Sequence, residues 1–231
     1  MTRNIAQFLS VLFHPLVMVT YMLVLLLLIN PYAFGVNQLG EQKSMVYLFG
    51  VFATTCLIPL FAIFMMRRLE MIGGNSENER MDRIGPFLIA GIFYIYQFYL
   101  FYQTSDVPLI FKSALFGATI ALFVAFIINL FSKISLHTVG MGALVGLVLV
   151  SILLFNYSSI RIGNWLFSLY LLLFLVVLLA GIVGSARLIL EDHLPNDLYG
   201  GYLVGFATQV IALQLLTYSQ CTIGNELIAH C

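Results

Sequence analysis

Charged residues are scarce in this chain. Lysine, arginine, aspartate and glutamate make up 9% of its 231 residues, whereas 61% are hydrophobic and the mean hydropathy is +1.03. A water-soluble domain carries about 25% charged residues, which keep its surface solvated. The deficit excludes an ordinary soluble domain and indicates that lipid surrounds most of the molecule.

The chain also lacks an excess of positive or negative charge, and it has few cysteines. Ten basic residues balance ten acidic ones, which gives no reason to expect a nucleic acid as a partner. Three scattered cysteines are too few for a disulfide framework or a zinc site, although Cys221 and Cys231 could pair in an oxidising compartment. The Asp-rich motifs of membrane prenyltransferases and the Gly-x-Ser-x-Gly turn of serine hydrolases are also absent.

Long apolar runs fill most of the sequence. In lipid, a segment must satisfy its own backbone hydrogen bonds, so a run of about 20 apolar residues becomes a membrane-spanning helix. We predict an all-α, polytopic transmembrane bundle of about seven helices that forms a single domain over residues 1–231. The approximate ranges of the helices are 8–29, 44–66, 86–103, 108–131, 137–156, 163–184 and 197–217.

The few charges gather on one face of this predicted bundle. Seven crossings return the chain to the side of its N-terminus after the second, fourth and sixth helices, in segments 67–85, 132–137 and 185–196. Counted with Arg3 and Asp197, these segments hold 14 of the 20 charged residues, seven basic and seven acidic. Because both signs are enriched, the positive-inside rule alone does not explain the asymmetry, and we interpret this face as the functional one.

The most informative polar cluster on this face precedes the last helix. Pro195 suits the first turn of a helix, and Asp197 would then lie near the free N–H groups of that turn. An aspartate close to His193 can fix the tautomer of the imidazole and stabilise its positive charge. The planar guanidinium of Arg187 suits a phosphate or a carboxylate. Alternatively, this is a loop in which the arginine simply pairs with the neighbouring acidic residues.

A second cluster, Lys133, Ser135 and His137, precedes the fifth helix. Ser135 is a plausible N-cap, and a helix N-terminus beside a lysine attracts anions. His137 could give a proton to a leaving oxygen near neutral pH. The alternative is a capping serine with a lysine and a histidine that merely lie at the membrane interface.

A third cluster enters the third helix. Arg80 and Arg83 are three residues apart, so they lie on one side of a helical turn and could clamp the same anion. Equally, they could form ion pairs within the loop, with Glu79 and Asp82.

The spacing of the three clusters brings them together. The intervals from Arg83 to His137 and from His137 to His193 are 54 and 56 residues, and each contains two predicted crossings. All three clusters therefore return to the same face. Arginines, two histidines and an aspartate around one anion suggest phosphoryl transfer through a nucleophilic histidine.

These residues resemble the signatures of a known family, the type 2 phosphatidic acid phosphatases. Arg187-x5-His193-x3-Asp197, with Ser185 before it and Gly201 after it, resembles the third signature of that family. Ser135-Leu136-His137 resembles the second signature, and the segment from Arg80 to Pro86 resembles the first. The similarity covers roughly residues 65–217. Ile134, Leu136 and Ser76 depart from the usual Pro, Gly and Lys of these signatures.

The resemblance implies a membrane lipid phosphatase with a six-helix core, which needs no metal or other cofactor. It would hydrolyse a lipid phosphate monoester or a polyprenyl diphosphate within the bilayer, in a bacterial inner (plasma) membrane. His193 would carry a phosphohistidine, Asp197 would orient it, and His137 would protonate the leaving alkoxide. The residues that would hold the phosphoryl oxygens are Arg187, Ser135, Lys133, Arg80 and Arg83.

Two other functions fit parts of the pattern. A non-catalytic lipid or anion transporter, or a binding protein with a degraded phosphatase site, would use the arginines but leaves both histidines without a role. A metal-dependent intramembrane enzyme would use His137, His193 and Asp197 as ligands. His14, just before Pro15 in the first helix, either lines a lipid entrance or is an interfacial histidine at a kink.

Overall fold

Seven helical segments of this computed structural model are long and apolar enough to cross a membrane. The structure describes residues 2–70, 81–153, 159–162, 165–191 and 193–229. Within them, the candidate spans are Arg3–Ile29, Gln42–Arg68, Ile84–Gln103, Leu109–Phe131, Leu136–Leu153, Leu169–Ile189 and Pro195–Ser219. The predicted all-α bundle of seven membrane-spanning helices is therefore confirmed, and the chain is a multi-pass integral membrane protein.

The spans are built from nine α-helices and short irregular turns among the described residues. The first span comprises α1 (Arg3–Leu12), the 3-10 turn η1 (Pro15–Val17) and α2 (Met18–Ile29). The 3-10 turn η2 (Pro31–Phe34) leads to α3 (Gln42–Phe52), which continues through the π-helical turn η3 (Ala53–Leu57) into α4 (Ile58–Arg68). The remaining elements are α5 (Met81–Gln103), α6 (Leu109–Phe131), α7 (Leu136–Leu153), β1 (Ser159–Ile162), β2 (Trp165–Ser168), α8 (Leu169–Ile189) and α9 (Pro195–Ala229).

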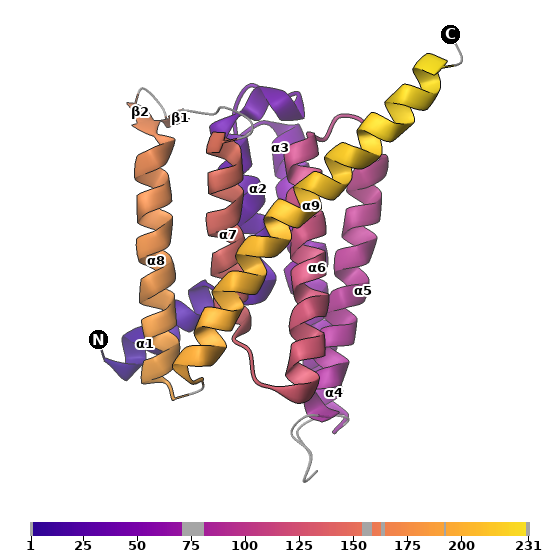
Figure 1. Cartoon of the computed structure of the whole chain (residues 1–231). Helices are drawn as coiled ribbons and strands as arrows, with labels where there is room; N and C mark the ends of the chain where they lie inside the picture. The colour runs from indigo at the N-terminus through magenta and orange to yellow at the C-terminus, as the bar shows by residue number, and fades with distance from the viewer. Residues whose placement is uncertain (1, 71–80, 154–158, 163–164, 192, 230–231) are drawn as a thin grey trace.

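The first span is bent where the sequence places His14 before a proline. Pro15 has no N–H to offer a continuing helix, and His14 takes an extended conformation with φ −63° and ψ 137°. Figure 1 shows α1 turning away from α2 at this break and lying beside the C-terminal end of α8. The bend thus carries the N-terminal helix toward the residues that precede α9.

The sixth span differs from its predicted range of 163–184. Residues 165–168 form the second strand of an antiparallel hairpin, in which Ile160 pairs with Phe167. Helix α8 begins only after this hairpin, where the Ser168 hydroxyl oxygen accepts a hydrogen bond from the Tyr170 N–H at 3.2 Å. At its other end α8 continues to Ile189, five residues beyond the predicted end.

The connections that carry the predicted site all lie at one end of the bundle. Figure 1 shows the N-terminus, the end of α4, the start of α5 and the α6–α7 and α8–α9 connections at the lower end. At the opposite end, Lys43 and Asp106 form an ion pair with an N-to-O distance of 2.9 Å. The hydrogen bond from Lys43 lowers the pKa of the Asp106 carboxyl below its ordinary value.

Helices α7 and α9 approach each other closely through small residues. Helix α9 runs diagonally across α7 and α6 (Figure 1). A β-carbon added at Gly205 of α9 would collide with the Val139 carbonyl oxygen and would lie 2.7 Å from the Ala143 nitrogen. A β-carbon at Gly142 of α7 would likewise collide with the Tyr202 carbonyl oxygen. Only glycine allows these two backbones to lie so near, as is common where transmembrane helices pack.

We therefore expect Gly205→Ala to destabilise the bundle. The added methyl group must push α9 away from α7, and overpacking of this kind lowers the free energy of unfolding by about 1–3 kcal/mol. For a chain of this size, that loss lowers the midpoint of thermal unfolding by roughly 2–12 °C. The measurement is thermal unfolding in detergent. Gly200→Ala is the matched control on the same helix, because a β-carbon there meets nothing within 4 Å. Equal midpoints for the two variants would contradict this account of the packing.

Candidate active site

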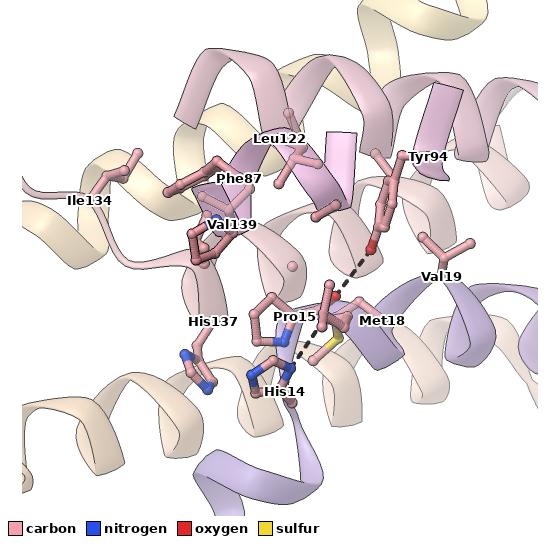
Figure 2. A pocket seen from close by; sticks show the side chains of 18 of the residues that line it. His14, Pro15, Met18, Val19, Phe87, Tyr94, Leu122, Ile134, His137 and Val139 are labelled. Carbon is pink, nitrogen blue, oxygen red and sulfur yellow. Dashed lines mark hydrogen bonds between the residues drawn. The ribbon is translucent and has the colours of Figure 1, made fainter. Parts of the chain in front are cut away.

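A cavity of about 1000 Å³ lies within the bundle. One face each of α2, α4, α5, α6 and α7 lines it, and α8 and the segment before α9 close one side. Figure 2 shows His14 and His137 side by side in this cavity, with Phe87, Leu122 and Tyr94 on its other wall. Its polar lining residues, apart from Tyr94, are His14, Arg67, Asn129, Lys133, His137, Arg187 and His193. Helix ends and their connections supply all of them.

Ser10 of α1 joins two of the predicted site residues. The Arg187 guanidinium donates a hydrogen bond from Nη1 to the Ser10 hydroxyl oxygen at 2.7 Å. His137 Nε2 lies 3.1 Å from the same hydroxyl oxygen and 2.9 Å from the Ser10 carbonyl oxygen. Because a carbonyl oxygen only accepts, the His137 ring carries a proton on Nε2 in this arrangement. One serine thus gathers an arginine from α8 and a histidine from α7.

His14 lies in the same group through the bend of the first span. Its Nδ1 accepts a hydrogen bond from the Leu16 N–H at 3.3 Å, so the side chain caps the 3-10 turn that follows. Its ring stands nearly perpendicular to that of His137, at a centroid distance of 5.8 Å and an interplanar angle of 82°. His14 thus occupies the kink of the first span and also lines the cavity.

The pair of His193 and Asp197 is arranged by the start of α9. Pro195 is the first residue of that helix, as predicted, so Asp197 lies in its first turn. Asp197 Oδ2 accepts a hydrogen bond from the Leu194 N–H at 3.0 Å and lies 3.5 Å from His193 Nδ1. Both side chains are largely buried, with exposed fractions of 16% for His193 and 12% for Asp197. The backbone bond fixes the carboxylate, and the carboxylate faces one nitrogen of the imidazole.

Ser135 is in the predicted position but makes a different contact. Its carbonyl oxygen accepts from the Val139 N–H at 3.0 Å, which is the first bond of α7, so Ser135 occupies the N-cap position. Its side chain does not cap, because Oγ is buried without a hydrogen-bond partner among the described residues. Ser135 is also not among the residues that line the cavity, whereas Lys133 is. Its N–H donates to the Asp197 carbonyl oxygen at 3.3 Å and thereby ties the start of α7 to the start of α9.

The first cluster is only partly covered by the described residues. Arg80 lies outside them, and of Arg83 the structure describes the backbone alone, in the first turn of α5. Arg67 of α4 and Asn129 of α6 line the cavity in the neighbourhood where this cluster was expected. Ser10 and Asn129 belong to no motif in the sequence, and Arg67 was expected only as one of the charges of segment 67–85. The available signal was that Ser10 and His14, four residues apart, are the only polar residues of the apolar stretch from Phe8 to Pro15.

The charge of the cavity favours an anion. Arg67, Lys133 and Arg187 bring three basic side chains to its polar part, and no aspartate or glutamate occurs among the described residues that line it. Asp197 contacts His193 but does not itself line the cavity. Within the described part of the chain, no group of three or more His, Cys, Asp or Glu side chains is placed to hold a metal ion. Fixed positive charge next to low-dielectric surroundings binds a phosphate or carboxylate group strongly.

No family model, curated protein or solved structure matches this chain. The geometry of the cavity and the signatures in the sequence are therefore the grounds on which a function can be argued.

We expect the cavity to bind tungstate, a non-hydrolysable analogue of phosphate. Millimolar tungstate should raise the midpoint of thermal unfolding by several degrees, because a ligand that binds only the folded state stabilises it. Arg187→Gln should remove this shift. Lys112→Gln serves as a control because Lys112 lies at the opposite end of the bundle, where its ammonium donates to the Tyr102 carbonyl. A shift that survives in Arg187→Gln would contradict an anion site at this arginine.

Proposed function

We propose that this protein is an integral membrane phosphatase that hydrolyses a lipid phosphate monoester or a polyprenyl diphosphate through a phosphohistidine. The observation that carries the proposal is the meeting of His137, Arg187 and His193, from three separate segments, at the polar part of a largely apolar cavity. The resemblance of the same residues to the signatures of type 2 phosphatidic acid phosphatases supports it. The proposed location is a bacterial inner membrane.

His193 is the proposed nucleophile. Asp197 lies next to Nδ1, so a neutral imidazole keeps its proton there and presents the lone pair of Nε2. In the first step Nε2 forms a bond to phosphorus while the bond between phosphorus and the ester oxygen breaks. The imidazole becomes positively charged, and the Asp197 carboxylate stabilises it. The planar donors of Arg187 hold the phosphoryl oxygens, on which charge is spread in the transition state.

His137 is the proposed acid and base. In its protonated form it gives the leaving oxygen a proton, so that the lipid departs as an alcohol or a monophosphate. Water then attacks phosphorus, His137 takes a proton from that water, and the bond between phosphorus and Nε2 breaks. Inorganic phosphate leaves, and both histidines return to their starting states.

The Ser10 hydroxyl suggests how a phosphate would fit. Its oxygen is within hydrogen-bond distance of both the Arg187 guanidinium and the His137 ring, as an ester or phosphoryl oxygen of a substrate would have to be. Rotation about the Cα–Cβ bond of Ser10 would release that position and leave the carbonyl oxygen, which also holds His137, unmoved. A phosphoryl oxygen of the substrate would take the place of the Ser10 hydroxyl between Arg187 and His137.

We expect His193→Ala to abolish phosphate release and Asp197→Asn to lower kcat strongly, because the amide no longer holds the productive tautomer. Loss of the corresponding aspartate in serine proteases costs about 10⁴-fold, and we expect at least about 10²-fold here. The assay measures inorganic phosphate from phosphatidic acid, phosphatidylglycerol phosphate, a polyprenyl diphosphate and phosphorylated lipid A in mixed micelles. Asp106→Asn, at the opposite end of the bundle, is the matched control.

The intermediate can be tested separately. Acid-labile phosphate should attach to the wild-type protein after rapid denaturation and should be missing from His193→Ala, with thermal unfolding showing that the variant is folded. Normal turnover by His193→Ala would overturn the mechanism. Loss of activity on treatment with a strong chelator would favour the metal-dependent alternative. Lipid phosphate binding without hydrolysis of any substrate would favour a binding or transport protein.

A further inference from the structure

The cavity extends well beyond the polar residues of the candidate site. Its lining continues along α5 from Pro86 to Tyr94 and along α6 from Asn129 to Ala118. At 1.5 Å per helical residue these stretches reach about 12 and 16 Å into the bundle. The hydrocarbon core of a bilayer is about 30 Å thick, so this depth is close to that of one leaflet.

The inner part of the cavity is apolar and is lined by alanines together with longer apolar side chains such as Met22, Ile63 and Leu122. Tyr94 is the one residue with a polar group in the inner lining that the structure describes, and its hydroxyl donates to the Pro15 carbonyl at 3.4 Å (Figure 2). Four alanines on the lining helices leave space there: Ala90, Ala118, Ala121 and Ala143. Larger residues at these positions would fill the chamber.

We infer that this inner chamber binds the hydrocarbon chain next to the phosphate and thereby selects substrates by the length of that chain. Three basic side chains at the outer part and an apolar chamber of leaflet depth match an amphiphile with an anionic head and a single extended chain in one leaflet. A lipid whose chains all stayed in the surrounding bilayer would leave this chamber unused. The identity of the head group rests on the proposed function, whereas the chamber itself does not.

Ala118 and Ala90 are the positions that set the usable depth. Ala118 is half-buried and lies at the inner end of the lining of α6, and Ala90 is buried on α5 one turn before Tyr94. A phenylalanine at position 118 would occupy the innermost space and leave the polar part unchanged. The same residue at position 90 would block the chamber nearer to the head group.

The test uses n-alkyl phosphonates of 4 to about 16 carbons, whose carbon–phosphorus bond a phosphatase of this kind does not cleave. Binding to the full chain in nanodiscs is measured by displacement of tungstate. For the wild-type protein we expect the affinity to rise about three- to fourfold for each methylene that enters the chamber, and then to level off. In Ala118→Phe the affinity should level off at a shorter chain, with unchanged affinity for the shortest phosphonates. In Ala90→Phe the affinity should level off at a still shorter chain.

Ile92→Phe is the matched control, because Ile92 lies on the same helix as Ala90 but is 63% exposed on the outside of the bundle. Thermal unfolding shows whether each variant is folded, and Ala118→Leu replaces any variant that is not. The proposal would be contradicted if affinity depended on chain length identically in the wild-type protein and the folded Ala118 variant. It would also be contradicted if Ile92→Phe shortened the chain length at which affinity levels off by the same amount. These outcomes are independent of hydrolysis, so the chamber and the phosphatase proposal can fail separately.

Discussion

The close approach of α7 and α9 is the constraint on which the rest of the site depends. Gly142 and Gly205 let the two backbones come nearer than any side chain would permit, and the Ser135 N–H bonds directly to the Asp197 carbonyl. In a membrane, such packing replaces the hydrophobic drive that holds soluble helices together. It places the start of α7, with His137, beside the start of α9, with Asp197 and the preceding His193.

The bend of the first span completes this arrangement. A straight helix through His14 would carry residues 3–12 away from α8, whereas the break at Pro15 returns α1 to the end of α8 and brings Ser10 to Arg187. An arginine in a largely apolar bundle is costly unless its donors are satisfied. A serine and a backbone carbonyl from α1 supply acceptors for Arg187 and His137, so the N-terminal helix is part of the site and not merely a membrane anchor.

The cavity divides into two chemically different parts because each helix contributes one continuous face. On α6 the lining face runs from Asn129, near the end of the helix, to Leu122, Ala121 and Ala118 deeper in the bundle, so one stripe changes from polar to apolar along its length. An anionic head and a hydrocarbon chain could be held together there without either group crossing an unfavourable environment. The proposed chemistry and the proposed chain selection are consequences of this single shape.

Much of the architecture was predictable from the residues alone. Seven apolar runs determined seven spans, because lipid leaves a backbone no partner outside its own segment. Two crossings between successive clusters predicted that all three lie at one end, and Pro195 marked the start of α9. The predicted range of the sixth helix was wrong at both ends, since local pairing of Ile160 with Phe167 competes with a helix and hydropathy does not distinguish the two.

Tertiary structure alone decided which polar groups meet. Ser10 carries no motif, yet it bridges Arg187 and His137 from more than one hundred residues away in sequence. Ser135 lies within a motif but does not line the cavity. Hydropathy and spacing act along the chain and place each residue at a depth in the membrane. Which neighbour a side chain meets depends on how closely the helices pack. That distance is set by residues from both partners, such as Gly142 of α7 and Gly205 of α9, and a single helix does not determine it.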